Sequence, residues 1–425
     1  MKHLPLPLSL VLVLCLACAC GGSGGGGPLD QGDLVSGFGF GGVALHGAAT
    51  NGTLRALAAT DTHLFAVGGD IAPGGDSRWR IEKRSVTSGN LDFGFGVDGV
   101  VTTNPSPGTD RILAIDVDAD AIYVGGWDAI PGPLRWRIEK RSQLDGSLVG
   151  DFGVGGVVVE DFGPGTETLT GILVTGGAVY VCGNDGQNIR IQKRNAVSGA
   201  LDPAFGVGGT ITEDPSAWYD TMSSFATDGA ALYVGGRDQS AGHGDWSLRI
   251  EKRSLVDGSL IPGFGVGGVL HSNPSPNYDG CYDLVVDDGS LYITGTDETV
   301  GAGDRSFRIE KRSAATGALI PAFGVGGVIS QDLGPGLEQF YELVVADGWV
   351  FLAGDDQVGG ERRWHVQKRD SITGALEPGF GIGGSIVLDP QPGVEYAYDL
   401  VVRGPYLFVG GVAPEGQWRL EKRMK

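Results

Sequence analysis

Residues Arg80 to Val100 (RIEKRSVTSGNLDFGFGVDGV) decide the fold, because both halves of this stretch recur along the whole chain. The first half, typified by an aromatic residue followed by Arg-Ile-Glu-Lys-Arg, returns in seven copies centred on Ile81, Ile138, Ile191, Ile250, Ile309, Val366 and Leu420. The second half, Phe-Gly-x-Gly-Gly, returns in seven copies that begin at Phe38, Phe95, Phe152, Phe205, Phe264, Phe323 and Phe380. Two motifs that alternate in this way identify a repeat protein.

The spacing of the motifs is constant in all but one segment of the repeat. The separation from a central residue to the next Phe, as from Ile81 to Phe95, is the same in every interval. In every repeat but the first, an acidic residue follows the Phe at a constant separation, as Asp110 follows Phe95. Another position, occupied mostly by Asp and called the marker here, follows the acid at a constant separation, as Asp128 follows Asp110. The stretch from this marker to the next central residue varies in length, so the repeat from Ile138 to Ile191 is shorter than the repeat from Ile191 to Ile250. A rigid unit with one variable loop is typical of stacked repeats.

Each repeat predicts four β-strands. The first is an apolar run such as 112–117, and a tight turn rich in Asp and Gly leads to the second, such as 121–126. The third is the alternating strand 136–141, and the fourth starts at Phe-Gly-x-Gly-Gly. Seven such units predict an all-β, seven-bladed β-propeller of four-stranded blades. The alternative, a solenoid, needs capping repeats with a polar outer face, and both ends of the array look like ordinary repeat fragments.

The two ends of the array complement each other. It opens with a lone fourth strand, 38–45, and finishes with the first three strands of a unit, 396–423. If the apolar strand is innermost, the N-terminal strand completes the last blade and closes the ring without a free terminal edge. We prefer this phase to the alternative, in which the Phe-Gly strand is innermost and every blade is continuous in sequence. In both phases the variable loops and the loops before the acids share one face.

Composition excludes several protein classes. The 76 glycines do not recur at every third position, which excludes collagen, and 41% hydrophobic residues argue against disorder. The chain has 31 basic and 51 acidic residues, a formal net charge of −20. This balance argues against nucleic acid as a partner, because nucleic acids are bound through Lys and Arg patches.

Residues 1–19 have the features of a lipoprotein signal peptide. Lys2 precedes an uncharged apolar run, 4–19, which is too short for a stop-transfer helix. The run ends in 16–20, LACAC, which resembles the lipobox of bacterial lipoproteins and implies that Cys20 carries the lipid. Residues 20–33 then form a Gly-rich tether, and 34–425 form the propeller. We expect an exported protein anchored by lipid to the bacterial cell envelope, at the outer membrane or cell surface; an ordinary secretory signal is the alternative.

The repeats resemble the delta-60 repeat family of bacterial surface propellers. The family pattern is Gly-x-Leu-Asp-x-x-Phe-Gly-x-Gly-Gly, then an acid, then Asp-Gly-x-Ile-x-Val-x-Gly. Residues 201–209, LDPAFGVGG, match it closely, and the likeness covers 34–425. Two features depart from the pattern: the Lys after Asp-Gly is missing, and the mostly apolar third strand is replaced by Arg-Ile-Glu-Lys-Arg. The resemblance implies a propeller at the cell surface and no known catalytic activity.

Two sets of charged residues are candidate sites. The third-strand charges suit either ion pairs between neighbouring blades or a basic belt for polysaccharide or anionic lipid, and their regular repetition favours the ion pairs. The acids before the first strands suit either a ring at the channel mouth that binds Ca²⁺ or a cationic ligand, or caps for backbone N–H groups. The ring comprises Asp110, Glu167, Asp220, Asp279, Glu338 and Glu395.

Aromatic residues in and beside the variable loops are candidate contacts for a sugar or a protein partner: Trp127, Trp218, Tyr219, Trp246 and Tyr278. No Ser-His-Asp order and no zinc spacing is present, so we assign no catalytic residue. We expect a monomeric, non-catalytic binding or scaffold module for an unknown protein or polysaccharide, which meets the membrane through its lipid anchor alone. The alternative is a metal-dependent or carbohydrate-active enzyme at the acidic channel mouth.

Overall fold

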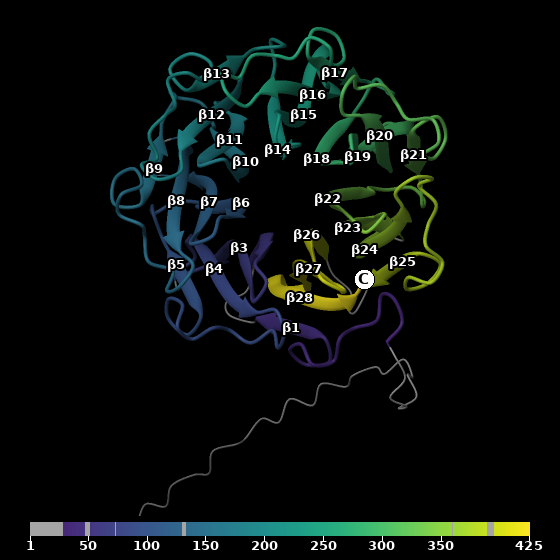
Figure 1. The fold of residues 1–425 in the computed structure, drawn as a ribbon. Coiled ribbons are helices and arrows are strands. Elements are labelled where there is room, and N and C mark those ends of the chain that lie inside the picture. The colour runs from purple at the N-terminus through teal and green to yellow at the C-terminus, as the bar shows by residue number, and fades with distance from the viewer. Residues whose placement is uncertain (1–28, 47–51, 73, 130–132, 359, 389–394) are drawn as a thin grey trace, which may run out of the picture.

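The computed structural model describes residues 29–46, 52–72, 74–129, 133–358, 360–388 and 395–425. These residues form seven four-stranded sheets, arranged as blades around a central opening (Figure 1). All neighbouring strands within a blade are antiparallel, for example β6–β7 and β7–β8. The prediction of an all-β, seven-bladed propeller is therefore confirmed.

The two inner strands of each blade are the apolar run and the strand after the Asp/Gly turn. The innermost strands are β2 (Thr53–Ala59), β6 (Arg111–Val117), β10 (Thr168–Thr175), β14 (Thr221–Thr227), β18 (Gly280–Asp287), β22 (Gln339–Ala346) and β26 (Tyr396–Arg403). The second strands are β3 (His63–Ile71), β7 (Ala121–Asp128), β11 (Ala178–Asn184), β15 (Ala231–Gly242), β19 (Ser290–Gly301), β23 (Trp349–Val358) and β27 (Tyr406–Ala413).

The third strand carries the Arg-Ile-Glu-Lys-Arg motif, and the outermost strand follows the Phe-Gly-x-Gly-Gly motif. The third strands are β4 (Ser77–Ser85), β8 (Arg135–Ser142), β12 (Ile189–Asn195), β16 (Asp245–Ser254), β20 (Asp304–Ser313), β24 (Glu361–Asp370) and β28 (Gln417–Met424), the last preceded by the short 3₁₀ helix η1 (Pro414–Gly416). The outermost strands are β1 (Val43–His46), β5 (Val100–Thr103), β9 (Val157–Glu160), β13 (Thr210–Glu213), β17 (Val269–Ser272), β21 (Val328–Gln331) and β25 (Ser385–Leu388).

The N-terminal strand β1 closes the ring. It pairs with β28 in the order β1-β28-β27-β26, with Val43 opposite Glu421 (Figure 1). A further bridge joins Leu34 to Arg423. The phase with the apolar strand innermost is thus the one the protein adopts, and the last blade combines both ends of the array.

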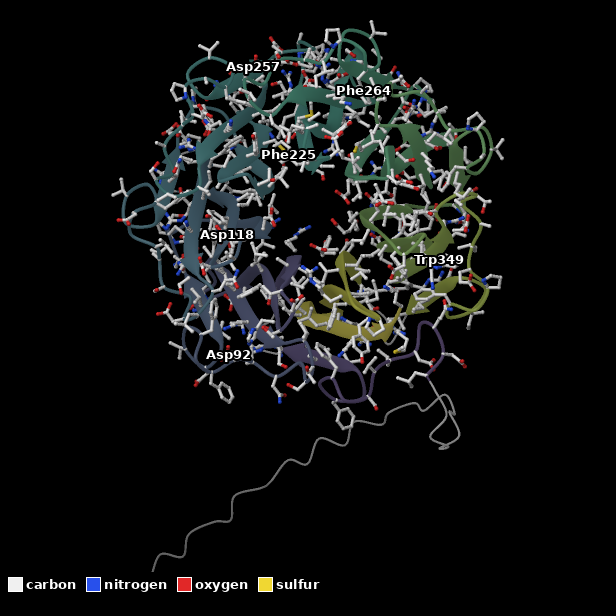
Figure 2. The ribbon with its side chains drawn as sticks, viewed as in Figure 1. Asp92, Asp118, Phe225, Asp257, Phe264 and Trp349 are labelled. Atoms are coloured by element: carbon white, nitrogen blue, oxygen red, sulfur yellow. The ribbon has the colours of Figure 1, made fainter. Side chains whose placement is uncertain are left out.

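The Phe-Gly-x-Gly-Gly motif forms a turn, whereas the sequence predicted that the fourth strand starts at its Phe. In blade one the strand begins at Val100, after the motif, and Phe95 is fully buried. Gly96 has φ +57°, and a Cβ there would lie 2.2 Å from the carbonyl oxygen of Val100, so the turn requires glycine. The Phe packs edge-to-face on an aromatic residue of the second strand; for example, Phe264, labelled in Figure 2, lies 5.9 Å from Tyr233 between ring centroids.

A β-bulge interrupts the pairing of every innermost strand with the second strand. In blade five the register shifts between Cys281 and Asp283, and the same shift recurs in the six other blades. The second strand approaches the bulge closely, because a Cβ at Gly295 would lie 1.8 Å from the carbonyl oxygen of Gly280. Bulges re-aim side chains, and these seven bulges lie beside the central opening.

The variable loops and the loops before the acids share one face, which we call the loop face. Parallel bridges join the two sets of loops between adjacent blades, for example Trp246 to Tyr278 and Arg305 to Leu337.

Candidate functional site

The structure places the predicted acid ring inside the loops of the loop face, away from the walls of the central cavity. Asp110 is fully buried and accepts hydrogen bonds from Ser106 N at 3.0 Å, Ser106 Oγ at 2.6 Å and Ala129 N at 3.1 Å. Asp220 and Asp279 are buried as well, and each accepts hydrogen bonds from the backbone N–H and the hydroxyl group of a serine four residues earlier. Burial raises the pKa of all three carboxyl groups, that of Asp279 to about 6.

The glutamate members of the ring follow loops without that serine. Burial raises the pKa of Glu167 to about 7, although Glu167 accepts backbone hydrogen bonds from Phe162 N, at 2.6 Å, and from Gly163 N. Burial, reinforced by Asp332 and Asp304, raises the pKa of Glu338 to about 8. Glu395 is buried as well. Most acids of the ring thus accept hydrogen bonds from loop N–H groups. That the ring binds Ca²⁺ stays a prediction.

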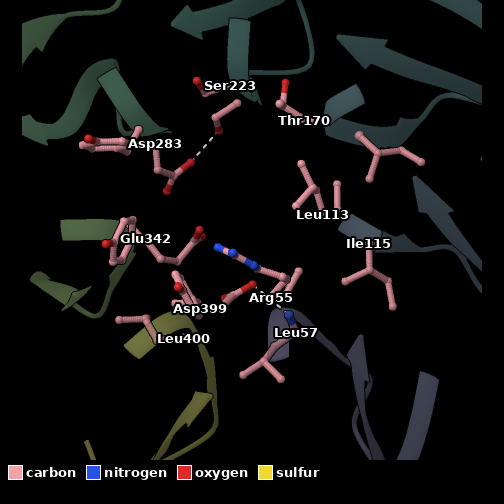
Figure 3. A pocket seen from close by; sticks show the side chains of 18 of the residues that line it. Arg55, Leu57, Leu113, Ile115, Thr170, Ser223, Asp283, Glu342, Asp399 and Leu400 are labelled. Carbon is pink, nitrogen blue, oxygen red and sulfur yellow. Dashed lines mark hydrogen bonds between the residues drawn. The ribbon is translucent and has the colours of Figure 1, made fainter. Parts of the chain in front are cut away.

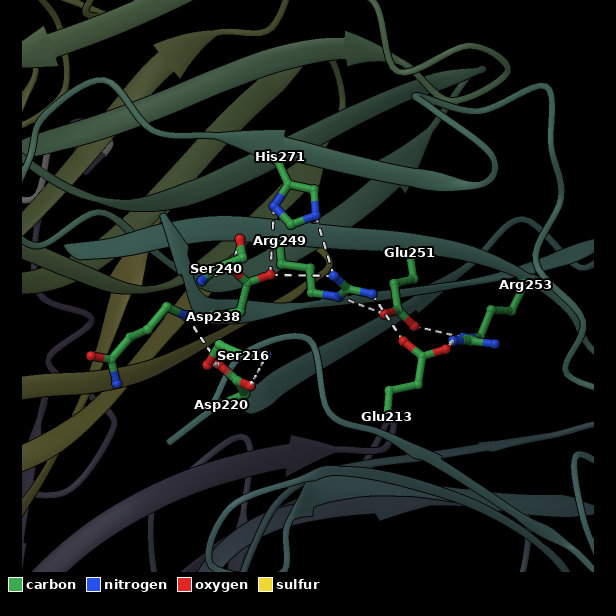
Figure 4. A network of polar contacts seen from close by, with 10 residues as sticks. Glu213, Ser216, Asp220, Asp238, Ser240, Arg249, Glu251, Arg253 and His271 are labelled. Atoms are coloured by element: carbon green, nitrogen blue, oxygen red, sulfur yellow. Dashed lines mark hydrogen bonds and ion pairs between the residues drawn. The ribbon is translucent and has the colours of Figure 1, made fainter. Parts of the chain in front are cut away.

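The third-strand charges form buried ion-pair networks within and between blades (Figure 4). In β16, Glu251 lies between two arginines, 2.6 Å from Arg249 Nε and 2.6 Å from Arg253 Nε. Glu213, on β13 of the preceding blade, contacts the same two arginines. The second arginine also donates to a carbonyl five residues on, here Gly258 O at 2.7 Å. These contacts support the structural interpretation of the charge repeat.

A central cavity of about 400 Å³ is lined by all seven innermost strands at and beside their bulges (Figure 3). Its wall is not symmetric. Blades one to four contribute apolar or small residues such as Leu113, Gly171 and Ser223, together with Arg55. Blades five to seven contribute a tyrosine and an acid each, namely Tyr282 with Asp283, Tyr341 with Glu342, and Tyr398 with Asp399.

The three cavity acids are held by neighbouring blades. Asp399 accepts a hydrogen bond from Leu57 N at 2.7 Å (Figure 3). Asp283 accepts hydrogen bonds from Ser224 Oγ and from Leu343 N. Burial raises the pKa of Asp283 to about 6. Burial and the other cavity acids raise the pKa of Glu342 well above its usual range, and Glu342 shares a hydrogen bond with Asp283. These shifts favour the protonated form of the pair, and a protonated carboxyl group donates as well as accepts hydrogen bonds.

Arg55 is the basic residue on the cavity wall. It points into the opening from β2, and its guanidinium lies over the ring of Tyr398, 4.2 Å from the centroid (Figure 3). Its Nε has no hydrogen-bond partner among the described residues. Arg55 thus offers a free donor to a molecule in the cavity.

Four of the five candidate loop aromatics gather on blades four and five. Tyr219 packs on Trp246 at 5.9 Å, and Trp246 on Tyr278 at 6.0 Å. Trp218 is 43% exposed and packs on His243 at 4.3 Å. Trp127 lies apart, on β7, where Arg111 lies over its ring.

These loop aromatics continue into the cavity. The hydroxyl groups of Tyr278 and Tyr282 lie 3.4 Å apart, and Tyr282 packs on Tyr341 at 5.7 Å. Tyr341 packs on Tyr398 at 5.1 Å. We call this chain of rings the aromatic row; in order it comprises Tyr219, Trp246, Tyr278, Tyr282, Tyr341 and Tyr398.

The cavity residues were not predicted from the sequence, although the sequence contains a signal for them. The segments 282–286 (YDLVV), 341–345 (YELVV) and 398–402 (YDLVV) recur in three consecutive repeats, with an acid inside an otherwise apolar strand. Buried acids in strand interiors need a partner or a function. The bulge that turns them toward the axis has no sequence mark of its own.

The membrane-anchor prediction concerns residues outside the described part of the chain, where Cys20 lies. Within the described ranges, no helix has the length and hydropathy of a membrane span. Cys182 and Cys281 are buried free thiols.

No protein-family model and no curated protein matches the chain. Among solved structures, the chain is similar to Sqt1 from Chaetomium thermophilum, with 12% identity and a TM-score of 0.44 over 90% of this chain and 100% of that one. It is also similar to Drosophila semaphorin 2a, with 10% identity and a TM-score of 0.49 over 93% of this chain and 76% of that one.

Proposed function

We propose that this propeller is a non-catalytic glycan-binding module, held at the bacterial envelope by a lipid on Cys20. The observation that carries the ligand class is the aromatic row, which leads from the loop face into the central cavity. Tyr and Trp rings offer flat apolar faces next to polar tips, which suits contact with sugar rings.

The polar groups beside the row favour a hydroxyl-rich ligand over an anionic one. Burial raises the pKa values of Glu342 and Asp399 and so favours their protonated forms, which both donate and accept hydrogen bonds. Arg55 contributes an unpaired donor. Sugar hydroxyls both donate and accept, so they match this mixture of groups.

The spacing of the cavity acids supports binding over glycoside hydrolysis. A pair of hydrolytic carboxyl groups flanks the scissile bond at a separation of about 5–10 Å. Asp283 and Glu342 hydrogen-bond to each other, which leaves no room between them for a glycosidic bond. The carbohydrate-active alternative would therefore need a different pair.

The envelope location rests on the lipobox-like residues 16–20 and on the resemblance of the repeats to the delta-60 family. Globomycin, which blocks lipoprotein signal cleavage, should cause the unprocessed chain to accumulate. A Cys20→Ser variant should leave the membrane fraction. A wild-type protein that is soluble and insensitive to globomycin would refute the anchor.

A glycan array probed with the purified chain tests the ligand class. We expect retention on neutral oligosaccharides and weak retention on highly sulfated ones, given the net charge of −20. If the array captures nothing while a cross-linked envelope protein co-purifies through the loop face, the ligand is a protein and the glycan proposal is wrong.

A further inference from the structure

Three carboxylates meet on the loop face where blade five adjoins blade six. Asp304 begins β20, Asp332 follows β21, and Glu338 directly precedes β22. One oxygen of each residue lies within 4.8 Å of an oxygen of the other two. Asp332 is exposed, Asp304 is half-buried and Glu338 is fully buried, so the cluster is open to solvent on one side.

In blades one and four, the residue equivalent to Asp304 pairs with an amide of the same blade. Asn104 Nδ2 donates to Asp76 at 2.8 Å, and Asn273 Nδ2 donates to Asp245 at 3.1 Å. Asp76, Asp245 and Asp304 all lie five residues before the central Ile of the third strand. Asp332 occupies the position of Asn104 and Asn273, so here a second carboxylate replaces the amide.

Glu338 points into this cluster without a partner of its own. Its counterparts Asp110 and Asp279 accept hydrogen bonds from Ser106 and Ser275, but Gly334 occupies the serine position. Neither carboxylate oxygen of Glu338 has a hydrogen-bond partner within the described residues. A buried carboxylate without a donor is costly unless a cation or a proton compensates it.

The other two carboxylates each keep an oxygen available. Asp304 Oδ1 accepts from Gly336 N at 3.0 Å, and Asp332 Oδ1 accepts from Gly334 N at 2.8 Å. The nearest basic residue in sequence, Arg305, is turned to Glu298 at 3.0 Å and to the ring of Tyr278. No ion pair between these three acids and a Lys or Arg occurs in the described part of the chain.

We propose that Asp304, Asp332 and Glu338 form a Ca²⁺ site that ties blade five to blade six. All donors are carboxylate oxygens, which hard cations prefer. Oxygens bound to one Ca²⁺ lie about 2.3–2.6 Å from the ion and hence at most about 5 Å from one another, in agreement with the cluster. Water would complete the coordination on the exposed side.

The test is thermal unfolding of the full chain after removal of metal ions, with Ca²⁺ added back to about 1 mM, the range in which extracellular calcium modules bind. We expect the midpoint to rise by several degrees, because the ion binds the folded state alone. Glu338→Gln should abolish this rise.

Asp332→Asn provides a second, non-disruptive variant, because it recreates the Asp–Asn pair of blades one and four. We expect it to have a higher midpoint than the wild type without Ca²⁺ and no response to Ca²⁺. Glu167→Gln is the matched control: its loop has the same Asp-x-Gly-Pro-Gly-x-Glu sequence, but Pro133 stands where Asp304 would be, so the response should persist. An unchanged wild-type midpoint, a full response in Asp332→Asn, or a stronger response to Mg²⁺ than to Ca²⁺ would overturn the calcium site.

Discussion

At the scale of single residues, the buried acids that make the cavity wall polar lower the free energy of unfolding when they are ionised. Asp283 is 7% exposed, and burial raises its pKa to about 6, above the ordinary value of 3.8. The unfolded chain therefore releases this proton at a lower pH than the folded protein. The free energy of unfolding falls as the pH rises from about 4 to 6, and the cost persists above that range.

Replacing Asp283 by Asn should remove this cost. We expect Asp283→Asn to raise the free energy of unfolding by roughly 1–3 kcal/mol at pH about 7.5 and to have little effect near pH 4. Urea unfolding at both pH values measures the difference.

Asp228→Asn is the control of opposite sign. Burial disfavours ionisation of Asp228, but hydrogen bonds from Ala231 N and Ala230 N outweigh burial and lower its pKa. Asp228→Asn should therefore lose stability at pH about 7.5 and lose less at low pH. An Asp283→Asn variant with the same pH profile as the wild type would show that Asp283 ionises normally.

At the scale of elements, the third strand joins the blades through its buried charges. Glu310 is fully buried and lies 2.6 Å from Arg308 and 2.5 Å from Arg312. Two repeats have Gln at this position, Gln192 and Gln367, and Arg369 Nε still donates to Gln367 Oε1 at 2.8 Å. The fold thus requires an acceptor between the basic residues more than it requires a charge.

This difference separates two substitutions of Glu310. Glu310→Ala should lower the free energy of unfolding by about 3–5 kcal/mol, because it leaves buried guanidinium groups without their partner. Glu310→Gln should lose less than half as much, since the amide oxygen still accepts. Urea unfolding of both variants checks the prediction, and equal losses would mean that the charge itself is needed.

How far the sequence predicts each element depends on what its residues encode. The alternation of Arg-Ile-Glu-Lys-Arg and the apolar runs encode strands, and their strict spacing encodes blades. The sequence predicts a strand that starts at Phe95-Gly96, whereas the structure has a turn there. A pattern of apolar and glycine residues does not reveal that Gly96 needs a positive φ. Tyr341 and Glu342 point inward because of the bulge in β22. They lie close to Asp283 because neighbouring blades pack together, and the sequence of a single repeat does not encode that contact.

At the scale of the whole molecule, the ring depends on β1. This strand covers the edge of β28, and Lys422 Nζ donates to Val86 O of blade one at 2.9 Å. The closure was predictable from the two incomplete ends of the repeat array. The asymmetry of the cavity was not predicted, because it depends on the bulges that turn the acids of blades five to seven toward the axis, and these bulges have no sequence signature of their own.

Removal of β1 should open the ring. A chain starting at residue 47 exposes the backbone N–H and C=O groups of β28, so we expect it to associate and to unfold at a lower temperature than a chain starting at residue 29. Light scattering coupled to size-exclusion chromatography and a thermal scan give both quantities. A monomeric short chain with an unchanged midpoint would mean that β1 is dispensable.

The aromatic row and the central cavity form the single binding site proposed for this protein. Calorimetric titration with a neutral oligosaccharide selected on the array tests this claim most directly. Trp246→Ala, within the row, should weaken binding by at least about tenfold, whereas Trp127→Ala, on blade two, should leave it unchanged, with thermal scans confirming that both variants are folded. Loss of affinity in Trp127→Ala with full affinity in Trp246→Ala would contradict the account.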